Sequence, residues 1–528
     1  MIQVTNLTFS YPGSYDAVFD GVSFQFDTQW RLGFLGRNGR GKTTLLRLLM
    51  GQYEYGGSIS GVPPCTYFPH PVSNPRQLAL EVLSAVCPTA EEWELLRESG
   101  LLGVESEALY RPFETLSNGE QTKCLLAALF CGESRYLLID EPTNHLDAAG
   151  RQAVAEYLRK KQGFLLVSHD RAFLDGCTDH TLALNRTGPE LIRGSFSVWY
   201  REKEARDRGE LAQNERLKGE IRRLEQAARR TSAWSDQVEK TKYASKNSGL
   251  RPDRGYVGHK SAKMMKRAKS LESRQESAIR EKAALLHDVE RAEPLKLAPR
   301  AFHSARLLEL DRVSIDYGDG PVCGEVSFSL SQGERLCLEG RNGSGKTSLL
   351  RLALGEELEH TGLLWRASGL TVSYVPQRAD HLRGSLTDFA AAQRIDRTRF
   401  FTVLRKLDFS RALLERDMAG YSAGQKKKVL LAASLCQSAH LYIWDEPLNY
   451  IDLFSRIQME ELILQYRPTM VFVEHDRAFS ERIATKAVSL CPAGQGQSLR
   501  TAPPLKTLEE VGENEKVLNF LNQKITEY

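Results

Sequence analysis

Hydrophobic and polar residues follow the same succession of patterns in two halves of this chain. In the first half, residues 22–36 alternate apolar and polar side chains as a strand does, and residues 43–50, TTLLRLLM, have helical spacing. Residues 136–141 and 164–170, YLLIDE and FLLVSHD, are short apolar runs that end in polar side chains. Buried strands have this pattern, and open α/β sheets bind ligands at such strand ends. We therefore expect α/β domains.

Four motifs occur twice, in the same order. They are GRNGRGKTT at 36–44 and GRNGSGKTS at 340–348, LSNGEQTK at 116–123 and YSAGQKKK at 421–428, LLIDEPTNHLD at 137–147 and YIWDEPLNYID at 442–452, and LVSHDRAF at 166–173 and FVEHDRAF at 472–479. The copies are 304 to 306 residues apart, which indicates that a whole domain is duplicated. We expect a first domain at 1–200, a linker at 201–298 with its tip near 235–262, a second domain at 299–502 and a short tail at 503–528.

The composition is that of a globular protein, with 41% hydrophobic and 26% charged residues. No apolar run approaches the roughly 20 residues needed to cross a bilayer. The N-terminus lacks the pattern of a signal peptide, so we expect a cytoplasmic protein without a membrane segment. The nine cysteines are scattered and show no paired spacing, so a disulfide framework or a zinc site is not expected.

The two glycine-rich motifs match G-x-x-x-x-G-K-[ST]. In such a loop the glycines let main-chain N–H groups surround phosphates at a helix N-terminus. Lys42 and Lys346 would reach the β- and γ-phosphates of a nucleotide, and Thr43 and Thr347 would bind Mg²⁺. The alternative is a glycine-rich turn with a surface lysine. The candidate nucleotide-binding residues are Gly36, Asn38, Gly39, Gly41, Lys42, Thr43 and Thr44, with Gly340, Asn342, Gly343, Gly345, Lys346, Thr347 and Ser348.

Two adjacent acids end a predicted strand in each half. Asp140 and Asp445 are placed to hold Mg²⁺, and Glu141 and Glu446 are placed to polarise the attacking water. Neighbouring residues on a strand point to opposite sides, so the two acids can separate into these two roles. The alternative is that they are solvated acids at a strand end.

These motifs resemble the ATP-binding cassette (ABC) family, and the resemblance covers nearly all of both repeats. It implies that the signature residues of one cassette meet the γ-phosphate held by the other, so that one chain is a functional monomer with two shared ATP sites. The implied signature residues are Ser117, Gly119 and Glu120 in the first cassette and Ser422, Gly424 and Gln425 in the second.

The same resemblance assigns further roles. His169 and His475 match the switch histidines that contact the γ-phosphate, and Tyr11 and Tyr317 match the aromatics that stack on adenine, with core packing as the alternative for both tyrosines. Gln377 matches the glutamine that senses Mg²⁺ and water. The chain departs from the family pattern at three positions, so we expect two competent but unequal sites; these positions are His70 in place of that glutamine, and Asn118 and Ala423 in place of signature glycines.

The linker carries the basic character of the chain. Residues 201–298 contain 25 Lys and Arg against 16 Asp and Glu, whereas the whole chain has a net charge of +4. Segments 201–231 and 262–292 have the composition of long exposed helices. Apolar stripes follow both of them, which predicts an antiparallel coiled-coil hairpin; the stripes are Leu217, Ile221, Leu224 and Ala228, and Leu271, Ala278, Leu285 and Val289.

The charge is concentrated at the predicted tip. Between Lys240 and Lys269 there are ten Lys and Arg residues and one acid, interleaved with aromatic residues and methionines. This pattern favours RNA binding, with a solvated charge run as the alternative. The candidate RNA-binding residues are Lys242, Lys246, Arg251, Arg254, Tyr256, Lys260, Lys263, Lys266, Arg267 and Lys269.

Tandem cassettes with a charged linker and no membrane domain resemble the ABC-F family of translation factors. Residues 445–452, DEPLNYID, and the tip sequence at 255–269 resemble the Vga/Lsa group of antibiotic-resistance proteins. That likeness implies binding to the 70S ribosome with ATP bound. The tip would reach past the P-site tRNA toward the 23S rRNA of the peptidyl transferase centre and displace lincosamide, streptogramin A or pleuromutilin drugs.

Two alternatives remain at this stage. One is a housekeeping ABC-F translation factor acting on stalled ribosomes; the short segments 70–116 and 377–421 leave no length for the arm insertion that such factors carry. The other is the ATPase subunit of an efflux transporter, which would need membrane partners and would have no use for a basic linker tip.

Overall fold

The computed structural model of the chain describes residues 1–12, 17–132, 135–144, 146–185, 188–241, 266, 270–271, 273–274, 277–282, 295–317, 322–490 and 498–501. The chain divides into two compact units. One unit comprises Met1–Ser197 with Ala292–Tyr528 and contains both cassettes, and the other is Val198–Arg291.

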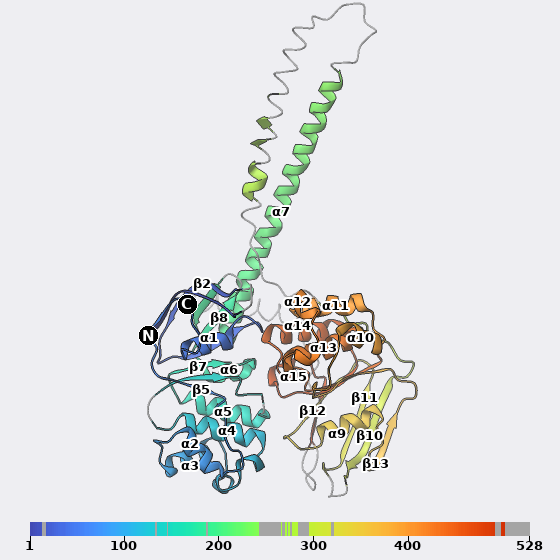
Figure 1. Cartoon of the computed structure of the whole chain (residues 1–528). Coiled ribbons are helices and arrows are strands. Elements are labelled where there is room, and N and C mark those ends of the chain that lie inside the picture. The colour runs from blue at the N-terminus through green and yellow to red at the C-terminus, as the bar shows by residue number, and fades with distance from the viewer. Residues whose placement is uncertain are drawn as a thin grey trace, which may run out of the picture. The chain divides into compact units, whose positions relative to one another are not determined.

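The first cassette consists of two sheets and the helices that cover them (Figure 1). An antiparallel sheet has the order β2-β1-β4, and a six-stranded sheet has the order β5-β6-β7-β3-β8-β9. The strands are β1 Ile2–Ser10, β2 Ala17–Phe26, β3 Arg31–Gly36, β4 Gly56–Ser60, β5 Cys65–Phe68, β6 Tyr136–Asp140, β7 Phe164–Val167, β8 His180–Asn185 and β9 Gly188–Arg193. The helices are α1 Lys42–Leu49, α2 Ala79–Val86, α3 Glu92–Leu101, η1 Ser106–Tyr110, η2 Phe113–Thr115, α4 Asn118–Leu129, α5 Ala148–Arg159 and α6 Arg171–Cys177.

The second cassette repeats this order, as the duplicated motifs predict. Its sheets have the orders β11-β10-β13 and β14-β15-β16-β12-β17-β18. The strands are β10 Arg306–Ile315, β11 Val326–Ser331, β12 Arg335–Glu339, β13 His360–Arg366, β14 Val372–Val375, β15 Leu441–Asp445, β16 Met470–Val473, β17 Lys486–Ser489 and β18 Ser498–Thr501. The helices are α9 Lys346–Leu354, α10 Leu386–Ala392, α11 Arg397–Lys406, α12 Arg411–Leu414, η3 Met418–Gly420, α13 Ala423–Cys436, α14 Leu453–Tyr466 and α15 Arg477–Ile483.

The central strands are buried on both faces. In β15, Leu441 and Ile443 join the core shared with the antiparallel sheet, whereas Tyr442 and Trp444 join the core formed with the helices. Successive side chains of a strand point to opposite faces, so a strand packed on both sides is apolar throughout. The apolar runs therefore become parallel strands, whereas residues 22–36, expected as one strand, are divided between β2 and β3 because Asp27 to Trp30 form a turn.

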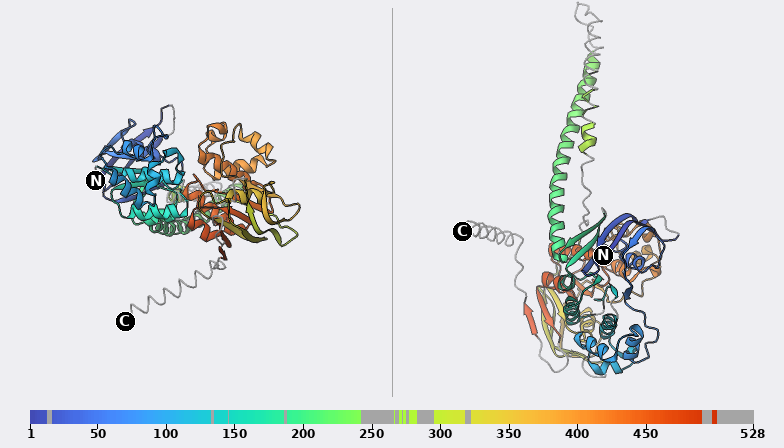
Figure 2. Two further views of the ribbon diagram at one scale, coloured as in Figure 1. Left: turned by 90° about the horizontal axis from the view of Figure 1, so that it is seen from below. Right: turned by 90° about the vertical axis from the view of Figure 1, so that its left-hand side faces the viewer.

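The unit Val198–Arg291 contains most of one long helix, α7 Phe196–Thr241, seen as a continuous rod in Figure 2. The sequence predicts a helix at 201–231 and a tip that begins near 235, so α7 extends ten residues further than predicted. No glycine or proline lies between Gly219 and Gly249, so nothing in the sequence ends the helix earlier. Leu217, Ile221 and Leu224 are each half-buried along one stripe of α7.

The second predicted linker helix, 262–292, is described only in part. Residues 266, 270–271, 273–274 and 277–282 are helical, and Lys282 forms an ion pair with Glu220 of α7. In the second predicted stripe Ala278 is half-buried, but Leu271 is 46% exposed and does not fit the predicted buried stripe. The side chains of Ala228, Leu285 and Val289 lie outside the described residues. No helix in the part of the chain described above is long and apolar enough to cross a membrane.

Candidate functional site

Each phosphate loop joins a central strand to a helix. The loop between β3 and α1 ends at Gly41, which has a φ of 86°. A Cβ atom there would lie 2.6 Å from Cγ1 of Val18, so both the backbone conformation and the packing require glycine. Gly345 has a φ of 83° before α9. Because the first N–H groups of a helix have no partner within the helix, both loops present an anion-binding helix N-terminus.

The loop lysines are held at these helix starts. Nζ of Lys42 donates to the carbonyl oxygens of Gly36 and Arg37 at 2.6 and 3.2 Å. Nζ of Lys346 donates to Gly340 and Arg341 at 2.8 and 2.7 Å. Both lysines are buried, and burial lowers the pKa of each ammonium. The remaining candidates lie in the same loops or in the first turn of the helix that follows, namely Asn38, Gly39, Thr43, Thr44, Asn342, Gly343, Thr347 and Ser348.

The sheet order brings the motifs together. In the first cassette β5, β6, β7 and β3 are neighbours, and β14, β15, β16 and β12 are neighbours in the second. These strands are parallel, so their carboxyl ends lie at one edge of each sheet. The phosphate loop, the acid pair and the histidine of each cassette follow those ends, as expected for a ligand site in an open α/β sheet.

The loop threonine of each cassette contacts the aspartate of the acid pair. Oγ1 of Thr43 donates to Oδ2 of Asp140 at 2.9 Å, and Oγ1 of Thr347 donates to Oδ2 of Asp445 at 2.8 Å. Burial raises the pKa of Asp445 to about 6, although the Thr347 hydroxyl lowers it. Oδ1 of Asp445 is buried with no hydrogen-bond partner among the described residues. A hydroxyl and an unsatisfied carboxylate oxygen are the oxygen donors that fit Mg²⁺.

The aspartate and the glutamate of each acid pair point to different neighbours, as expected for adjacent residues at the end of a strand. Glu141 and Glu446 follow their strands with φ values of 50° and 45°. Oε1 of Glu141 lies 3.3 Å from Nε2 of His169, and Oε1 of Glu446 lies 3.4 Å from Nε2 of His475. Each glutamate therefore faces the histidine that follows the next strand, while the aspartate beside it faces the phosphate loop.

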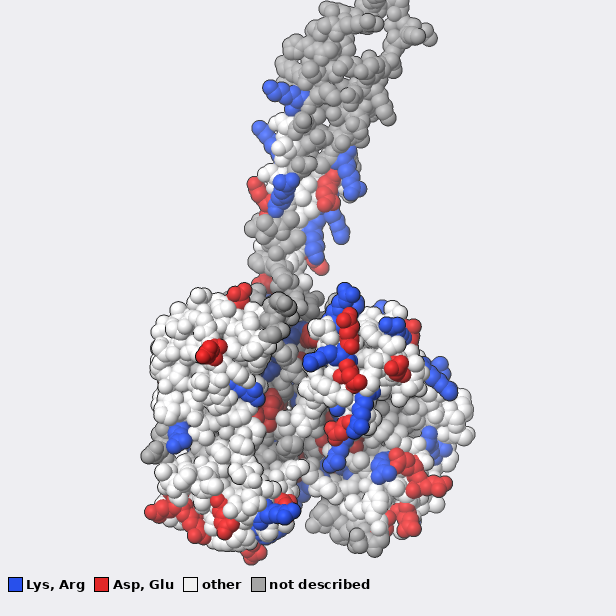
Figure 3. Space-filling model, in the orientation of Figure 1, with Lys and Arg blue, Asp and Glu red and all other residues white. Residues whose placement is uncertain are grey.

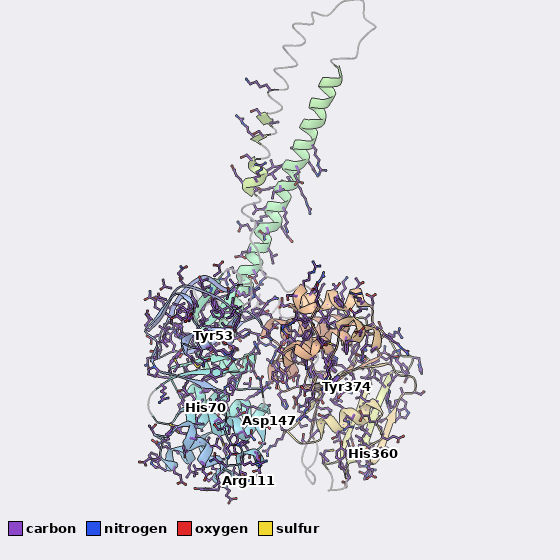
Figure 4. The ribbon with its side chains drawn as sticks, viewed as in Figure 1. Tyr53, His70, Arg111, Asp147, His360 and Tyr374 are labelled. Atoms are coloured by element: carbon purple, nitrogen blue, oxygen red, sulfur yellow. The ribbon has the colours of Figure 1, made fainter. Side chains whose placement is uncertain are left out.

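The two glutamates differ in electrostatic surroundings. Burial and the Asp140 charge raise the pKa of Glu141 to about 8. Burial also raises the pKa of Glu446, but the nearby side chains of His475 and Gln377 outweigh it and bring the value to about 2. At the position of Gln377 the first cassette has His70, labelled in Figure 4, whose Nδ1 lies 3.0 Å from the carbonyl oxygen of Pro71. The expected inequality of the sites thus has a structural counterpart.

The signature residues begin two helices. Ser117 caps α4 by accepting a hydrogen bond from the N–H of Glu120 at 3.2 Å, and Ser422 caps α13 by accepting one from Gln425 at 3.3 Å. The side chains of Glu120 and Gln425 accept hydrogen bonds from the N–H groups of these serines, which completes two capping boxes. The helix N-termini carry partial positive charge, which favours an anion.

A cavity of about 960 Å³ is lined by residues of both cassettes. From the second cassette it is lined by Lys346, Thr347 and Gln377, and from the first by Ser117 and Gly119. This combination is the one that the resemblance to ABC proteins implies for the second ATP site.

The phosphate loop of the first cassette contacts the second cassette directly. Nη1 of Arg37 donates to both carboxylate oxygens of Asp408 at 2.7 and 2.8 Å, and Nδ2 of Asn38 donates to the carbonyl oxygen of Tyr450 at 3.2 Å. A Cβ atom on the signature residue Gly424 would lie 2.5 Å from that same oxygen. The loop and the signature of the opposite cassette therefore share a neighbour.

The two candidate adenine-stacking tyrosines are partly exposed. Tyr11 is 38% and Tyr317 53% exposed, which is too much for core residues. The hydroxyl of Tyr11 is 2.8 Å from Oγ1 of Thr44, and that of Tyr317 donates to Oγ of Ser348 at 3.0 Å. Each ring is thus tied to the end of its phosphate loop.

Three side chains that the sequence motifs do not predict also contact these sites. Tyr67 donates to Oδ2 of Asp140 at 2.9 Å, Asn449 donates to Oε2 of Glu446 at 2.5 Å, and Lys427 donates to three carbonyl oxygens of the second cassette. The only sequence indication for Tyr67 and Asn449 is their place beside His70 and Glu446.

Among the candidate RNA-binding residues the structure describes Lys266, which is helical and exposed. The other candidates lie outside the described residues; they are Lys242, Lys246, Arg251, Arg254, Tyr256, Lys260, Lys263, Arg267 and Lys269.

Comparison with known proteins agrees with this geometry. Residues 19–144 and 323–449 match the ABC transporter family. ATP-binding protein Uup of Caulobacter vibrioides is 28% identical over 488 residues, 90% of this chain and 74% of that protein. Ribosome protection protein VmlR of Bacillus subtilis is 28% identical over 512 residues, 95% of this chain and 89% of that protein. Energy-dependent translational throttle protein EttA of Haemophilus influenzae is 25% identical over 522 residues, 89% of this chain and 88% of that protein.

Solved structures share the fold. The archaeal ribosome recycling factor aABCE1, solved with the stalk protein aP1, aligns with a TM-score of 0.58 at 21% identity, covering 94% of this chain and 90% of that one. A structure described as RNase-L Inhibitor aligns with a TM-score of 0.58 at 19% identity, covering 96% and 92%.

Two phosphate loops, two acid pairs and two signature helices on paired α/β domains define a tandem ABC-type ATPase. Over most of its length the chain is similar, at 25–28% identity, to Uup, VmlR and EttA, as the resemblance to ABC-F proteins leads us to expect.

Proposed function

We propose that this protein binds the bacterial ribosome in an ATP-bound closed state and displaces antibiotics from the peptidyl transferase centre. The expected drugs are lincosamides, streptogramin A and pleuromutilins, and ATP hydrolysis then allows release. The observation that carries the proposal is the alignment with a ribosome protection protein over 95% of this chain. It includes both cassettes and the linker, so the likeness extends beyond the ATPase motifs.

ATP would hold the two cassettes together. In the second site Lys346 would bind the β- and γ-phosphates, and Ser117 with the N-terminus of α4 would bind the γ-phosphate from the other cassette. In the first site Lys42, Ser422 and Gly424 would do the same. Loss of the γ-phosphate removes the contacts that join the halves, so hydrolysis would favour opening.

The chain's own residues would position the water. Glu141 and Glu446 would accept its proton, while His169 and His475 would hold the γ-phosphate beside them. Mg²⁺ would be held by Thr43 and Asp140, and by Thr347, Asp445 and Gln377. When bound, it supplies positive charge that stabilises the transferring phosphoryl group.

The linker would contact ribosomal RNA. The 46 residues of α7 span roughly 70 Å at 1.5 Å per residue. The half-buried stripe of α7 and the ion pair between Lys282 and Glu220 support an antiparallel hairpin with the segment that follows. Figure 3 shows Lys and Arg side chains along the described part of this linker. Such charge suits phosphate neutralisation, with the tip near 235–262 nearest the drug site.

Ribosome pelleting tests the ATP-dependent step. Glu141→Gln with Glu446→Gln is expected to keep ATP and to sediment with 70S ribosomes in ATP. Lys42→Ala with Lys346→Ala is the control, which is expected to lose the phosphate contacts of both loops and to stay in the supernatant. Equal pelleting of both double variants would contradict ATP-dependent binding.

Drug protection tests the linker tip. Changing Lys263, Lys266 and Arg267 to Glu should abolish resistance to lincosamides in a sensitive strain while ATP binding is unchanged. Lys218, Arg222 and Arg223, which are exposed on α7, give a control with the same charge change. Unchanged resistance in the tip variant would refute its role.

A housekeeping translation factor is the second candidate, because the translational throttle protein aligns over 89% of this chain. By the family resemblance, housekeeping ABC-F factors carry an arm insertion in the first cassette. The segment between β5 and α4 contains α2 and α3, matched by α10 and α11 in the second cassette. That match disfavours an insertion, and expression in a drug-sensitive strain decides between the two functions. An efflux ATPase would instead co-purify with membranes.

A further inference from the structure

A lysine is buried one turn into the signature helix of the second cassette. Lys427 of α13 is 2% exposed, and its Nζ donates to the carbonyl oxygens of Pro376, Gln377 and Asp445 at 2.8, 3.1 and 3.0 Å. An ammonium group has three donors, so these three carbonyls match its full donor capacity. Burying a charge is costly unless it is fully hydrogen-bonded, so this arrangement fixes Lys427 in one position.

The three carbonyls belong to the two loops that carry the candidate hydrolytic residues. Pro376 and Gln377 follow β14, and Asp445 ends β15, the adjacent parallel strand. Gln377 and Glu446 each lie two residues beyond the paired Val375 and Trp444, both line the same cavity, and Glu446 has a φ of 45°. The ammonium of Lys427 therefore joins the main chain of Gln377 to the peptide group between Asp445 and Glu446.

The first cassette is built differently at the equivalent position. Thr122 stands there, and its hydroxyl donates to the carbonyl oxygen of Asn118 in its own helix at 2.8 Å. His70 takes the place of Gln377 in the same cassette. The buried lysine and the glutamine whose main chain it holds thus occur together in the second cassette.

We propose that Lys427 is a positioning residue for ATP hydrolysis at the second site. It holds the loop of Gln377 against the end of β15, so that Gln377 and Glu446 keep the spacing needed to orient one water molecule. The water oxygen bonds to the γ-phosphorus as the bond from that phosphorus to the β–γ bridging oxygen breaks, and the water proton passes to Glu446. Lys427 lines the edge of the cavity, but its three donors all go to main-chain carbonyl oxygens, so it acts through the two loops.

Steady-state ATPase kinetics of the full chain test this role. Lys427→Met keeps the length of the side chain and removes all three donors, so kcat should fall about tenfold or more while KM for ATP changes less than twofold. Lys427→Gln retains an amide donor and should recover part of the lost kcat. Thr122→Val is the matched control in the first cassette and should leave kcat within about twofold.

Thermal unfolding separates positioning from a loss of structure. Lys427→Thr introduces the residue of the first cassette and serves if the methionine variant fails to fold. A folded variant with a normal kcat would overturn the proposal, as would a fall in kcat that simply follows loss of folded protein. The inference rests on the roles proposed for Gln377 and Glu446. A normal rate in Glu446→Gln would overturn those roles, whereas a slow Glu446→Gln beside a normal Lys427→Met would overturn this inference alone.

Discussion

Nε2 of His475 lies 3.4 Å from Oε1 of Glu446, so the candidate switch histidine and the candidate water-polarising acid of the second cassette are direct neighbours. His475 and Gln377 together keep the pKa of this carboxyl low against the effect of burial. The matching Glu141 has His169 at 3.3 Å but His70 in place of the glutamine. The carboxylate that must accept a proton is thus stabilised as an anion in one site and not in the other.

This difference predicts unequal contributions to turnover. Glu446→Gln should lower the ATPase kcat of the full chain more than Glu141→Gln, because the second site has both Gln377 and an ionised acid. Single-turnover hydrolysis of radiolabelled ATP by each variant measures the contribution directly. Equal losses in the two variants would contradict the unequal roles.

A substitution in the first cassette should restore part of the lost ATPase activity. In the Glu446→Gln background, His70→Gln should raise the residual rate several-fold, since it supplies the side-chain amide that Glu141 lacks. Asn118→Gly, a change in the signature of the first cassette, is a control that should not give this increase, because that signature belongs to the other site. No gain from His70→Gln would mean that the glutamine is not the cause.

Arg37 and Asp408 are predicted to couple the first phosphate loop to the second cassette. Asp408 has a φ of 66°, and Gly103 stands at the equivalent position of the first cassette, so the aspartate adopts a conformation that favours glycine. A double-mutant cycle of Arg37→Met and Asp408→Asn should give a coupling free energy of about 1 kcal/mol in urea unfolding, as Asp408 is part-exposed. A coupling near zero would show that the contact contributes nothing.

The contact of Glu460 with Arg171 is predicted to stabilise the pairing of the cassettes more than the contact of Arg37 with Asp408. The Glu460 carboxylate is fully buried, and it pairs with Arg171 of α6 and, at 2.7 Å, with Nη1 of Arg482. Burial raises the pKa of Glu460, so loss of a partner leaves a costly buried charge. Arg171→Met should lower the free energy of unfolding by about 3 kcal/mol.

A matched control tests the importance of burial for this contact. Arg477 occupies the same place in the second H-D-R-A-F motif, but its side chain is 73% exposed and pairs with Glu481. Arg477→Met should change the free energy of unfolding by less than about 0.5 kcal/mol. Similar losses from both methionine variants would contradict a special role for Glu460.

Acid should weaken the first cassette through Glu98. Burial raises the pKa of this carboxyl, but hydrogen bonds from Lys161 and Tyr157, at 2.7 and 2.5 Å, outweigh it and the pKa falls below its ordinary value of 4.5. A lowered folded-state pKa gives stability that is present above 4.5 and is lost as the pH falls below it. Thermal unfolding of Glu98→Gln should therefore depend less on pH between about 5 and 3 than that of the unchanged chain. Equal slopes would contradict the prediction.

The sequence by itself determined the duplicated α/β domains, the phosphate loops and the strand-end acids. Each of these depends on a short contiguous segment, where glycines, a lysine and apolar runs fix the local backbone, and the repetition shows that the domain is duplicated. Residues such as Lys42 and Asp140 could be proposed as site residues for this reason, whereas His169 came from the resemblance to ABC proteins. The linker helix was also evident from composition, but its end at Thr241 was not, because its length depends on the absence of any strong stop.

Only the tertiary structure decided how the two sites differ. Arg37 and Asp408 are 371 residues apart, and Lys427 is 51 residues from Pro376, so no local pattern joins them. Whether a buried lysine meets three carbonyls depends on two adjacent strands ending side by side, and whether His70 reaches Glu141 depends on the path of a loop. Such contacts are set by packing between segments that are distant in the sequence. A sequence motif identifies the residues but not the residues that they contact.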